Sequence, residues 1–278
     1  KHSAKEIYSF SLKLLGTNLI SAGGDTVRTL TIGKFYNPNQ LAYFDRGLNY
    51  SGLVTQVVNT SLSSVLLPVL SRSQDDKEQL LAISRKSVSL SAFIMIPALV
   101  LVAMLSRPLV LIVLSEKWLP CAIFLSIFCL LRIPGVITSI DKQAYYALGK
   151  SQIGLYYEII LLAFNLMSLI VTVRYSVLAV AVGFTLIEYI GNLVLMFISS
   201  KVYNYSIGKR IIDIYKPTIN SIVMALFMFI LNYVFTNSIA LLFSQIFLGV
   251  ISYYLLAYIT KDRNLTLIKQ KITNFKVK

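Results

Sequence analysis

The chain has 278 residues, of which 56% are apolar and only 14% are charged. A soluble domain carries roughly 25% charged residues because its surface must stay hydrated, so this composition excludes a soluble fold and predicts an integral membrane protein. The 26 Lys and Arg against 12 Asp and Glu give a net charge of +14. Because the basic residues fall between apolar segments, we interpret the excess as the positive-inside bias of membrane proteins rather than as a nucleic-acid-binding surface.

The predicted elements are apolar segments long enough to cross a bilayer as a helix, which takes about 20 residues. Eight segments qualify: residues 7–32, 41–70, 88–106, 119–140, 153–173, 177–199, 217–235 and 239–260. The first two are the least apolar, since they are rich in Ser, Thr, Asn and Gly. A ninth apolar piece, residues 109–114, is too short to cross and is interpreted as an extension of the third helix or an interfacial turn. The runs are continuous rather than alternating, which excludes a transmembrane barrel.

The connections between these segments alternate in positive charge. The N-terminus, the second, fourth and sixth connections and the tail are rich in Lys and Arg, whereas the intervening connections are poor and residues 236–238 carry no charge. This alternation predicts eight spans with both ends of the chain in the cytoplasm.

Small residues and prolines inside the spans predict local packing. Gly183 and Gly191 fall on one face of the sixth span, where a neighbouring helix is expected to approach closely. Pro68, Pro97 and Pro134 lie within or near the ends of spans and are expected to kink them.

Ionisable side chains inside the predicted spans are the candidate functional residues. Each costs roughly 2.5–3.5 kcal/mol at the bilayer centre, so it should face protein or water. Asp25 and Arg28 are neighbours on one helix face, which predicts either a local ion pair or part of a cavity wall. Glu188 and Arg132 each lie mid-span and are expected to interact or to share one hydrated cavity, with Glu188 as a possible proton carrier. The remaining members of the set are Lys13, Arg46 and Glu158, the last close enough to the interface to be wetted.

The second span carries a stripe of uncharged polar side chains at helical spacing, which includes Asn49, Gln56 and Asn59. Such a stripe suits the wall of a water-filled cavity, and hydrogen bonding between helices is an almost equally good explanation.

Several kinds of catalytic or metal site are absent from the sequence. There is no GxxxxGK[ST] phosphate loop and no pair of loop carboxylates for glycosyl transfer. His2 is the only histidine, and Cys121 and Cys129 stand without a second pair, so they are interpreted as packing thiols. The residues alone therefore predict a polytopic transporter or channel without a metal or cofactor, other than H⁺ or Na⁺ as a coupling ion.

Six short motifs resemble the polysaccharide transporter family, the flippases of lipopolysaccharide, O-antigen and teichuronic-acid type within the MOP superfamily. They are RTLTIGKFY (28–36), LAYFDRG (41–47), SVLLPVLS (64–71), QDD (74–76), EKWLPC (116–121) and ALGK (147–150). With the hydropathy pattern, the resemblance covers residues 7 to 260. The sequence departs from the family pattern at Tyr50 and Ser51, where a proline is usual.

The resemblance implies an all-α, MATE-like transporter lobe. Residues 1–199 would form the C-terminal six-helix lobe, residues 200–260 two additional transmembrane helices, and residues 261–278 a basic cytoplasmic tail. The N-terminal lobe of the same protein would be missing, either through processing or because the chain is a fragment. The resemblance also places the protein in the bacterial cytoplasmic (inner) membrane.

The implied function is flipping of a lipid-diphosphate-linked oligosaccharide, with an undecaprenyl carrier, for cell-surface polysaccharide synthesis by alternating access. The cavity candidates are Arg28, Arg46, Asp25, Lys13, Asn49, Gln56 and Asn59, and the coupling candidates are Glu188 and Arg132. Arg28 and Arg46 are expected near one cavity mouth, where guanidinium groups would attract the diphosphate unless Asp25 and Asp45 neutralise them.

Three other functions stay open. A MATE-like multidrug exporter would need an acidic cavity, whereas the first two spans offer more cations than carboxylates. A membrane-bound polymerase or ligase would need a large outer loop, and the longest outward connection, 107–119, is short. A channel is disfavoured because no filter-like repeat occurs. We therefore expect a transporter and not an enzyme.

Overall fold

The computed structural model describes residues 4–235 and 237–276; within them, the side chains of residues 4–7, 9, 10, 57–59, 61–64, 269 and 271–276 lie outside the description. The described residues form α-helices, one short 3₁₀ helix and no strand, which confirms the all-α prediction. The elements are α1 (Ala4–Phe35), α2 (Pro38–Arg72), α3 (Lys77–Leu114), η1 (Glu116–Trp118), α4 (Cys121–Leu131), α5 (Ile133–Ala147), α6 (Ser151–Thr172), α7 (Val177–Tyr203), α8 (Ile207–Val234), α9 (Ser238–Ile259) and α10 (Arg263–Lys276).

Each predicted span falls within one helix, to within one residue at its end, except that residues 119–140 are divided between α4 and α5. Six helical segments among the described residues are long and apolar enough to cross a membrane: α3, α4 with α5, α6, α7, α8 and α9. α1 and α2, 32 and 35 residues long, are not among these six, so the count of eight spans stays a prediction. Residues 109–114 continue α3, as one of the two interpretations expected.

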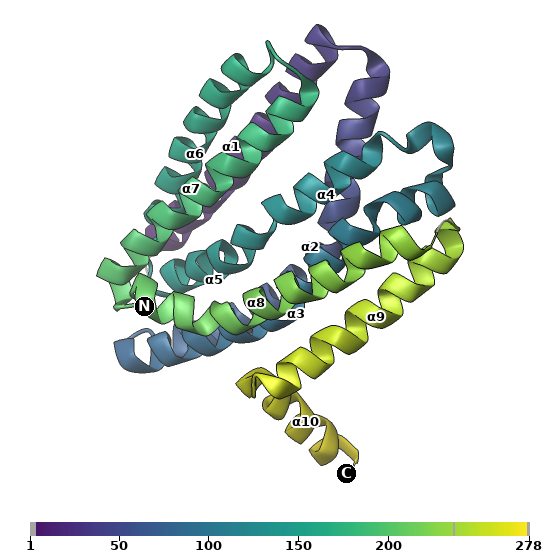
Figure 1. Cartoon of the computed structure of the whole chain (residues 1–278). Helices are drawn as coiled ribbons and strands as arrows, with labels where there is room; N and C mark the ends of the chain where they lie inside the picture. The colour runs from purple at the N-terminus through teal and green to yellow at the C-terminus, as the bar shows by residue number, and fades with distance from the viewer. Residues whose placement is uncertain (1–3, 236, 277–278) are drawn as a thin grey trace.

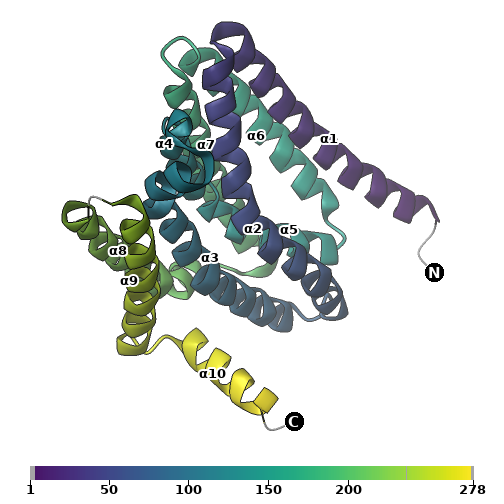
Figure 2. The same cartoon turned by 90° about the vertical axis from the view of Figure 1, so that its right-hand side faces the viewer.

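The helices form a tilted bundle in which α2, α4 and α5 lie between two outer groups (Figures 1 and 2). On one side α1 packs on α6, and α6 on α7. On the other, α8 packs on α3 and α9 on both. The turns between helices fall alternately at two opposite ends of the bundle, and the basic connections share one end with the N-terminus (Figure 1). This is the arrangement that an alternating topology requires.

The helix ends follow from ordinary capping chemistry. Asn37 accepts a hydrogen bond from the Gln40 amide ahead of Pro38, and Asp76 accepts from the first amides of α3. Ser176 and Ser206 cap α7 and α8 in the same way. The basic tail folds as α10, a helix that the sequence pattern did not predict.

The expected close approach at the sixth span is confirmed on α7. A Cβ added at Gly183 would lie 2.5 Å from Ser168 Oγ, and one at Gly191 would lie 2.8 Å from Leu161 Cδ1, both atoms of α6. The two glycines therefore set the spacing between α6 and α7, the helices that supply two of the three carboxylates of the cavity described below.

Pro134 has a stronger effect than the predicted kink, because the helix ends at Leu131 and restarts at Ile133. Proline donates no backbone hydrogen bond and its ring excludes the carbonyl four residues earlier. That carbonyl, of Leu130, accepts instead from the Tyr189 hydroxyl at 3.1 Å. α2 and α3 continue through Pro68 and Pro97.

Candidate transport cavities

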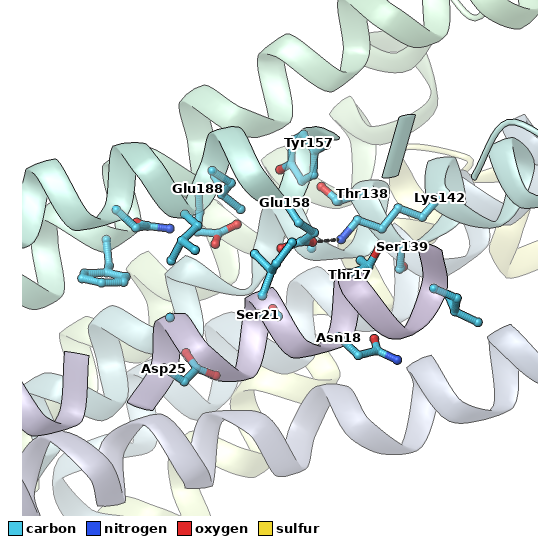
Figure 3. Close-up of a pocket in the computed structure, with 18 of the residues that line it drawn as sticks. Thr17, Asn18, Ser21, Asp25, Thr138, Ser139, Lys142, Tyr157, Glu158 and Glu188 are labelled. Atoms are coloured by element: carbon cyan, nitrogen blue, oxygen red, sulfur yellow. Dashed lines mark hydrogen bonds and ion pairs between the residues drawn. The ribbon is translucent and has the colours of Figure 1, made fainter. Parts of the chain in front are cut away.

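A cavity of about 500 Å³ lies among α1, α5, α6 and α7, and we call it the first cavity (Figure 3). Five charged side chains line it: Asp25 and Arg28 from α1, Lys142 from α5, Glu158 from α6 and Glu188 from α7. Because three of these helices are apolar enough to cross a membrane, the cavity gathers the charges where a bilayer would otherwise exclude them.

Arg28 lines the first cavity, and an ion pair with Asp25 neutralises its charge. Its guanidinium lies 2.8 Å from the Asp25 carboxylate, an ion pair one helical turn apart. Its Cζ also lies 4.9 Å from the centre of the Phe184 ring and 5.6 Å from that of Phe44. Arg28 is buried, whereas Asp25 is mostly exposed. The local ion pair, one of the two predicted alternatives, is therefore present, and it lies on the cavity wall.

Lys142 and Glu158 form the second ion pair of the cavity (Figure 3). The Lys142 ammonium also lies 5.3 Å from the centre of the Tyr157 ring. Glu158 is buried beneath Lys142 and lines the first cavity, and its expected wetting near the interface stays a prediction.

Glu188 is the third carboxylate of the cavity, and the structure gives it no ion pair among the described residues. It lies on the α7 wall near the Lys142–Glu158 pair (Figure 3). The first cavity thus holds three carboxylates and two cations.

Uncharged polar groups complete the lining. The Nε of Arg28, the Oε1 of Gln143 and the Oδ1 of Asn165 are buried and have no hydrogen-bond partner within the described part of the chain. Buried polar atoms are normally paired, so these groups are suited to bind water or a polar ligand. The lining can therefore hold a hydrated cation, a proton or hydroxyl-rich groups.

A second cavity, of about 470 Å³, lies beside α2 at the break between α4 and α5. Its lining includes Asn49 and Gln56 of the predicted polar stripe, and Arg132. Arg132 donates from Nε to Ser51 Oγ at 2.9 Å and from Nη2 to the Leu48 carbonyl at 3.0 Å. Glu188 lines the first cavity, so the two side chains form no ion pair within the described residues and share no cavity lining, although the charge of Glu188 acts on Arg132 at longer range. The helix break directs Arg132 toward α2 and not toward α7.

The remaining predicted residues are more dispersed. Arg46 is exposed and lies over the Trp118 ring, 5.6 Å from its centre, outside the lining of both cavities. The structure thus does not bring Arg28 and Arg46 together at one cavity. Lys13 is half-buried on α1, outside both linings. Asn59 belongs to α2, but its side chain lies outside the described residues.

A buried polar network that the sequence pattern did not predict lies at the end of the bundle that carries the basic connections. Asp141 of α5 and Arg210 of α8 form an ion pair at 2.7 Å with both side chains fully buried. Tyr203 at the end of α7 donates to the same carboxylate oxygen. Each of the two ionic residues lies just outside an apolar run, where the pattern indicates a charged connection.

A second ion pair continues this network. Arg85 of α3 donates to Asp213 of α8 through two nitrogens, at 2.8 and 2.7 Å, and Tyr205 donates to Asp213 at 2.9 Å. Burial raises the pKa of Tyr205 well above its ordinary value, so the hydroxyl stays a donor. The Tyr205 ring also stacks against Arg210, 4.0 Å from Cζ. The network therefore joins α8 to α3, α5 and α7.

Comparison with known proteins identifies relatives of this fold. Residues 1–123 match a family described as "Polysaccharide biosynthesis protein". The teichuronic acid biosynthesis protein TuaB of Bacillus subtilis (strain 168) is 20% identical over 81% of this chain and 47% of its own length. An uncharacterized membrane protein in the cps region of Klebsiella pneumoniae is 21% identical over 95% of this chain and 54% of its own length.

A solved structure of the lipid II flippase MurJ in an inward closed conformation superposes with a TM-score of 0.73 at 21% identity, covering 90% of this chain and 52% of that one. The MurJ-type fold is thereby established, and the chain spans about half the length of the relatives it matches. These findings confirm the resemblance to the polysaccharide transporter family that the motifs predicted. The chain is thus a multi-pass membrane protein with the MurJ-type fold.

Proposed function

From this relation to the polysaccharide transporter family, we propose that the protein containing this chain moves a lipid-linked oligosaccharide across the membrane for synthesis of a cell-surface polysaccharide. The carrier is undecaprenyl diphosphate, and the protein acts as a transporter rather than as an enzyme. It resides in the bacterial inner membrane with both ends of this chain in the cytoplasm. The distribution of basic connections supports this orientation.

The observation that carries the proposal is the first cavity inside a MurJ-type lobe. A polar space of about 500 Å³ with five charged side chains among membrane-length helices is costly unless it handles a polar cargo or ion. The lipid tail can remain in the bilayer while only the headgroup passes the polar wall. The chain covers 52% of MurJ, so we propose that a second lobe forms the opposite wall and that the two rock about the site.

We assign ion coupling to Glu188 and the Lys142–Glu158 pair. Glu188 faces the first cavity without an ion pair in the described structure, so it can take up H⁺ or Na⁺ when the cavity opens to one side. Lys142 and Glu158 line the same cavity, and their opposite charges offset each other in an ion pair. Arg132, the other coupling candidate, lies in the second cavity and takes no part in this exchange.

We assign attraction of the anionic headgroup to the cations beside the cavities. Arg46 is exposed, lies over the Trp118 ring and forms no ion pair among the described residues, so its charge reaches an approaching headgroup. Arg28 is offset by Asp25, and its effect is correspondingly smaller.

A MATE-like multidrug exporter is the second candidate, and one observation favours it. Three carboxylates against two cations give the first cavity the acidic excess that attracts cationic drugs. The relatives named for polysaccharide synthesis favour the flippase.

Deletion of the gene in its own host tests the two candidates together. The flippase proposal expects loss of surface polysaccharide, accumulation of the lipid-linked unit in the inner leaflet and restoration by the full-length gene. A multidrug exporter would instead leave the polysaccharide intact and increase sensitivity to cationic drugs, and that pattern would refute the proposal.

A further inference from the structure

We propose that the second cavity is an anion site in which Arg132 binds a phosphate group of the lipid-linked substrate. This inference rests on the proposed function and adds to it the residue that recognises the headgroup. It assigns to Arg132 a role that neither the coupling prediction nor the comparisons gave it.

The first argument is the charge balance of the cavity. The described lining of the second cavity contains Arg132 and no carboxylate, unlike the first cavity with its three. Within the described residues Arg132 forms no ion pair, whereas Arg28 and Lys142 each do. A half-buried cation among membrane helices is unfavourable without an anion. The carboxylates of Asp25 and Glu188 act on Arg132 only at longer range, so an anion in direct contact is best supplied by a ligand.

The second argument is the geometry of the Arg132 guanidinium, which two hydrogen bonds to α2 hold in place. Ser51 accepts from Nε and the Leu48 carbonyl accepts from Nη2. A guanidinium has five N–H donors in one plane, so three donors remain without a partner in the described structure. A planar set of free donors matches two oxygens of a phosphate or carboxylate.

The third argument is that α2 makes room for this side chain. A Cβ at Gly52 would lie 3.0 Å from Arg132 Nη2, so glycine lets the guanidinium cross the helix surface. Ser51 is fully buried and turns its hydroxyl to Nε. Asn49 and Gln56 lie about two turns apart on the same helix and offer amides to a ligand held at Arg132. The guanidinium is thus positioned before any ligand arrives.

Binding to the full-length protein in nanodiscs of neutral lipid tests the site. The probes are undecaprenyl diphosphate, undecaprenol as its neutral counterpart, and inorganic pyrophosphate as a competitor. We expect the parent to bind the diphosphate at least tenfold more tightly than undecaprenol. Arg132→Gln should lower diphosphate affinity at least tenfold and leave undecaprenol binding unchanged, and Arg132→Lys should lose part of the affinity because it keeps the charge without the planar donors.

Arg174→Gln is the matched control, because Arg174 is exposed in the turn between α6 and α7 and lines neither cavity. It should bind as the parent does.

If Arg132→Gln does not yield folded protein, Ser51→Ala is the variant to test. It removes the hydroxyl that accepts from Arg132 Nε, so the guanidinium is less fixed and diphosphate affinity should fall at least threefold. Competition by pyrophosphate would show that phosphate alone is recognised; an Arg132-dependent affinity without competition would show that the phosphate must be attached to its lipid.

Parental affinity for the diphosphate in folded Arg132→Gln or Ser51→Ala would overturn the site, as would a parent that binds undecaprenol equally well. Neither result touches the proposed function, which fails if deletion of the gene leaves the surface polysaccharide intact.

Discussion

Breaking the Asp141–Arg210 ion pair is the most severe test of how the bundle is held together. Arg210→Met removes the guanidinium that donates to Asp141 at 2.7 Å and leaves the carboxylate with the Tyr203 hydroxyl as its donor. Both side chains are fully buried, so water cannot replace the lost contact.

The expected cost follows from this burial. Removing one partner of a buried ion pair destabilises a protein by about 3–5 kcal/mol, whereas replacing both partners with apolar residues is often neutral. Arg210→Met should therefore lose about 3–5 kcal/mol, and Asp141→Leu with Arg210→Met should recover most of it. Arg85→Met is the comparison, because Arg85 is 35% exposed and Asp213 keeps Tyr205 as a donor. Its loss should be about 1 kcal/mol.

The order of stabilities of the parent and its variants is measured by thermal unfolding of the purified full-length protein. The readout is the fraction of protein that stays monodisperse at each temperature. The expected order is parent and double variant together, then Arg85→Met, then Arg210→Met well below. Equal losses in Arg85→Met and Arg210→Met, or a double variant as unstable as Arg210→Met, would refute the reasoning.

Three other substitutions test the site and the packing. Glu188→Gln in the full-length protein should abolish gradient-driven export at normal abundance, because we assign exchange of the coupling ion to this carboxylate, which has no ion pair in the described structure; normal export at normal abundance would remove it from coupling. Arg46→Ala should reduce export more than Arg28→Ala, since Asp25 already offsets Arg28, and equal export by both variants and the parent would contradict the assigned attraction. Gly183→Val should lower the abundance of folded protein, because a Cβ there meets Ser168 Oγ at 2.5 Å, whereas Gly208→Ala, where a Cβ meets nothing within 4 Å, should not.

Much of the fold could be predicted because it depends on local patterns. Apolar length located the helices, and the spacing of the glycines in α7 was enough to mark the face that contacts α6. The boundary between α4 and α5 was harder: Pro134 indicated a distortion, but whether a helix bends or ends depends on a partner for the Leu130 carbonyl, and that partner, Tyr189, lies 59 residues away.

The site was predictable in part, for the same reason. Asp25 and Arg28 are neighbours along the helix, so their ion pair follows from spacing. Lys142–Glu158 and Asp141–Arg210 join different helices, and residues at the end of an apolar run look like loop charges until the packing is known. Arg132 and Glu188 each lie near the middle of a predicted span. The rotation of each helix about its axis, which the sequence pattern does not give, places them in different cavities.

Reconstitution of the purified full-length protein in liposomes tests the central claim most directly. A labelled undecaprenyl-diphosphate-linked oligosaccharide is placed in both leaflets, and its sugar is measured by accessibility to an impermeant reagent under an imposed ion gradient. The account predicts that the protein exposes the protected fraction far faster than protein-free liposomes do, and that Glu188→Gln does not. Equal rates with and without the protein, in vesicles shown to contain it folded, would contradict the claim that it is a flippase.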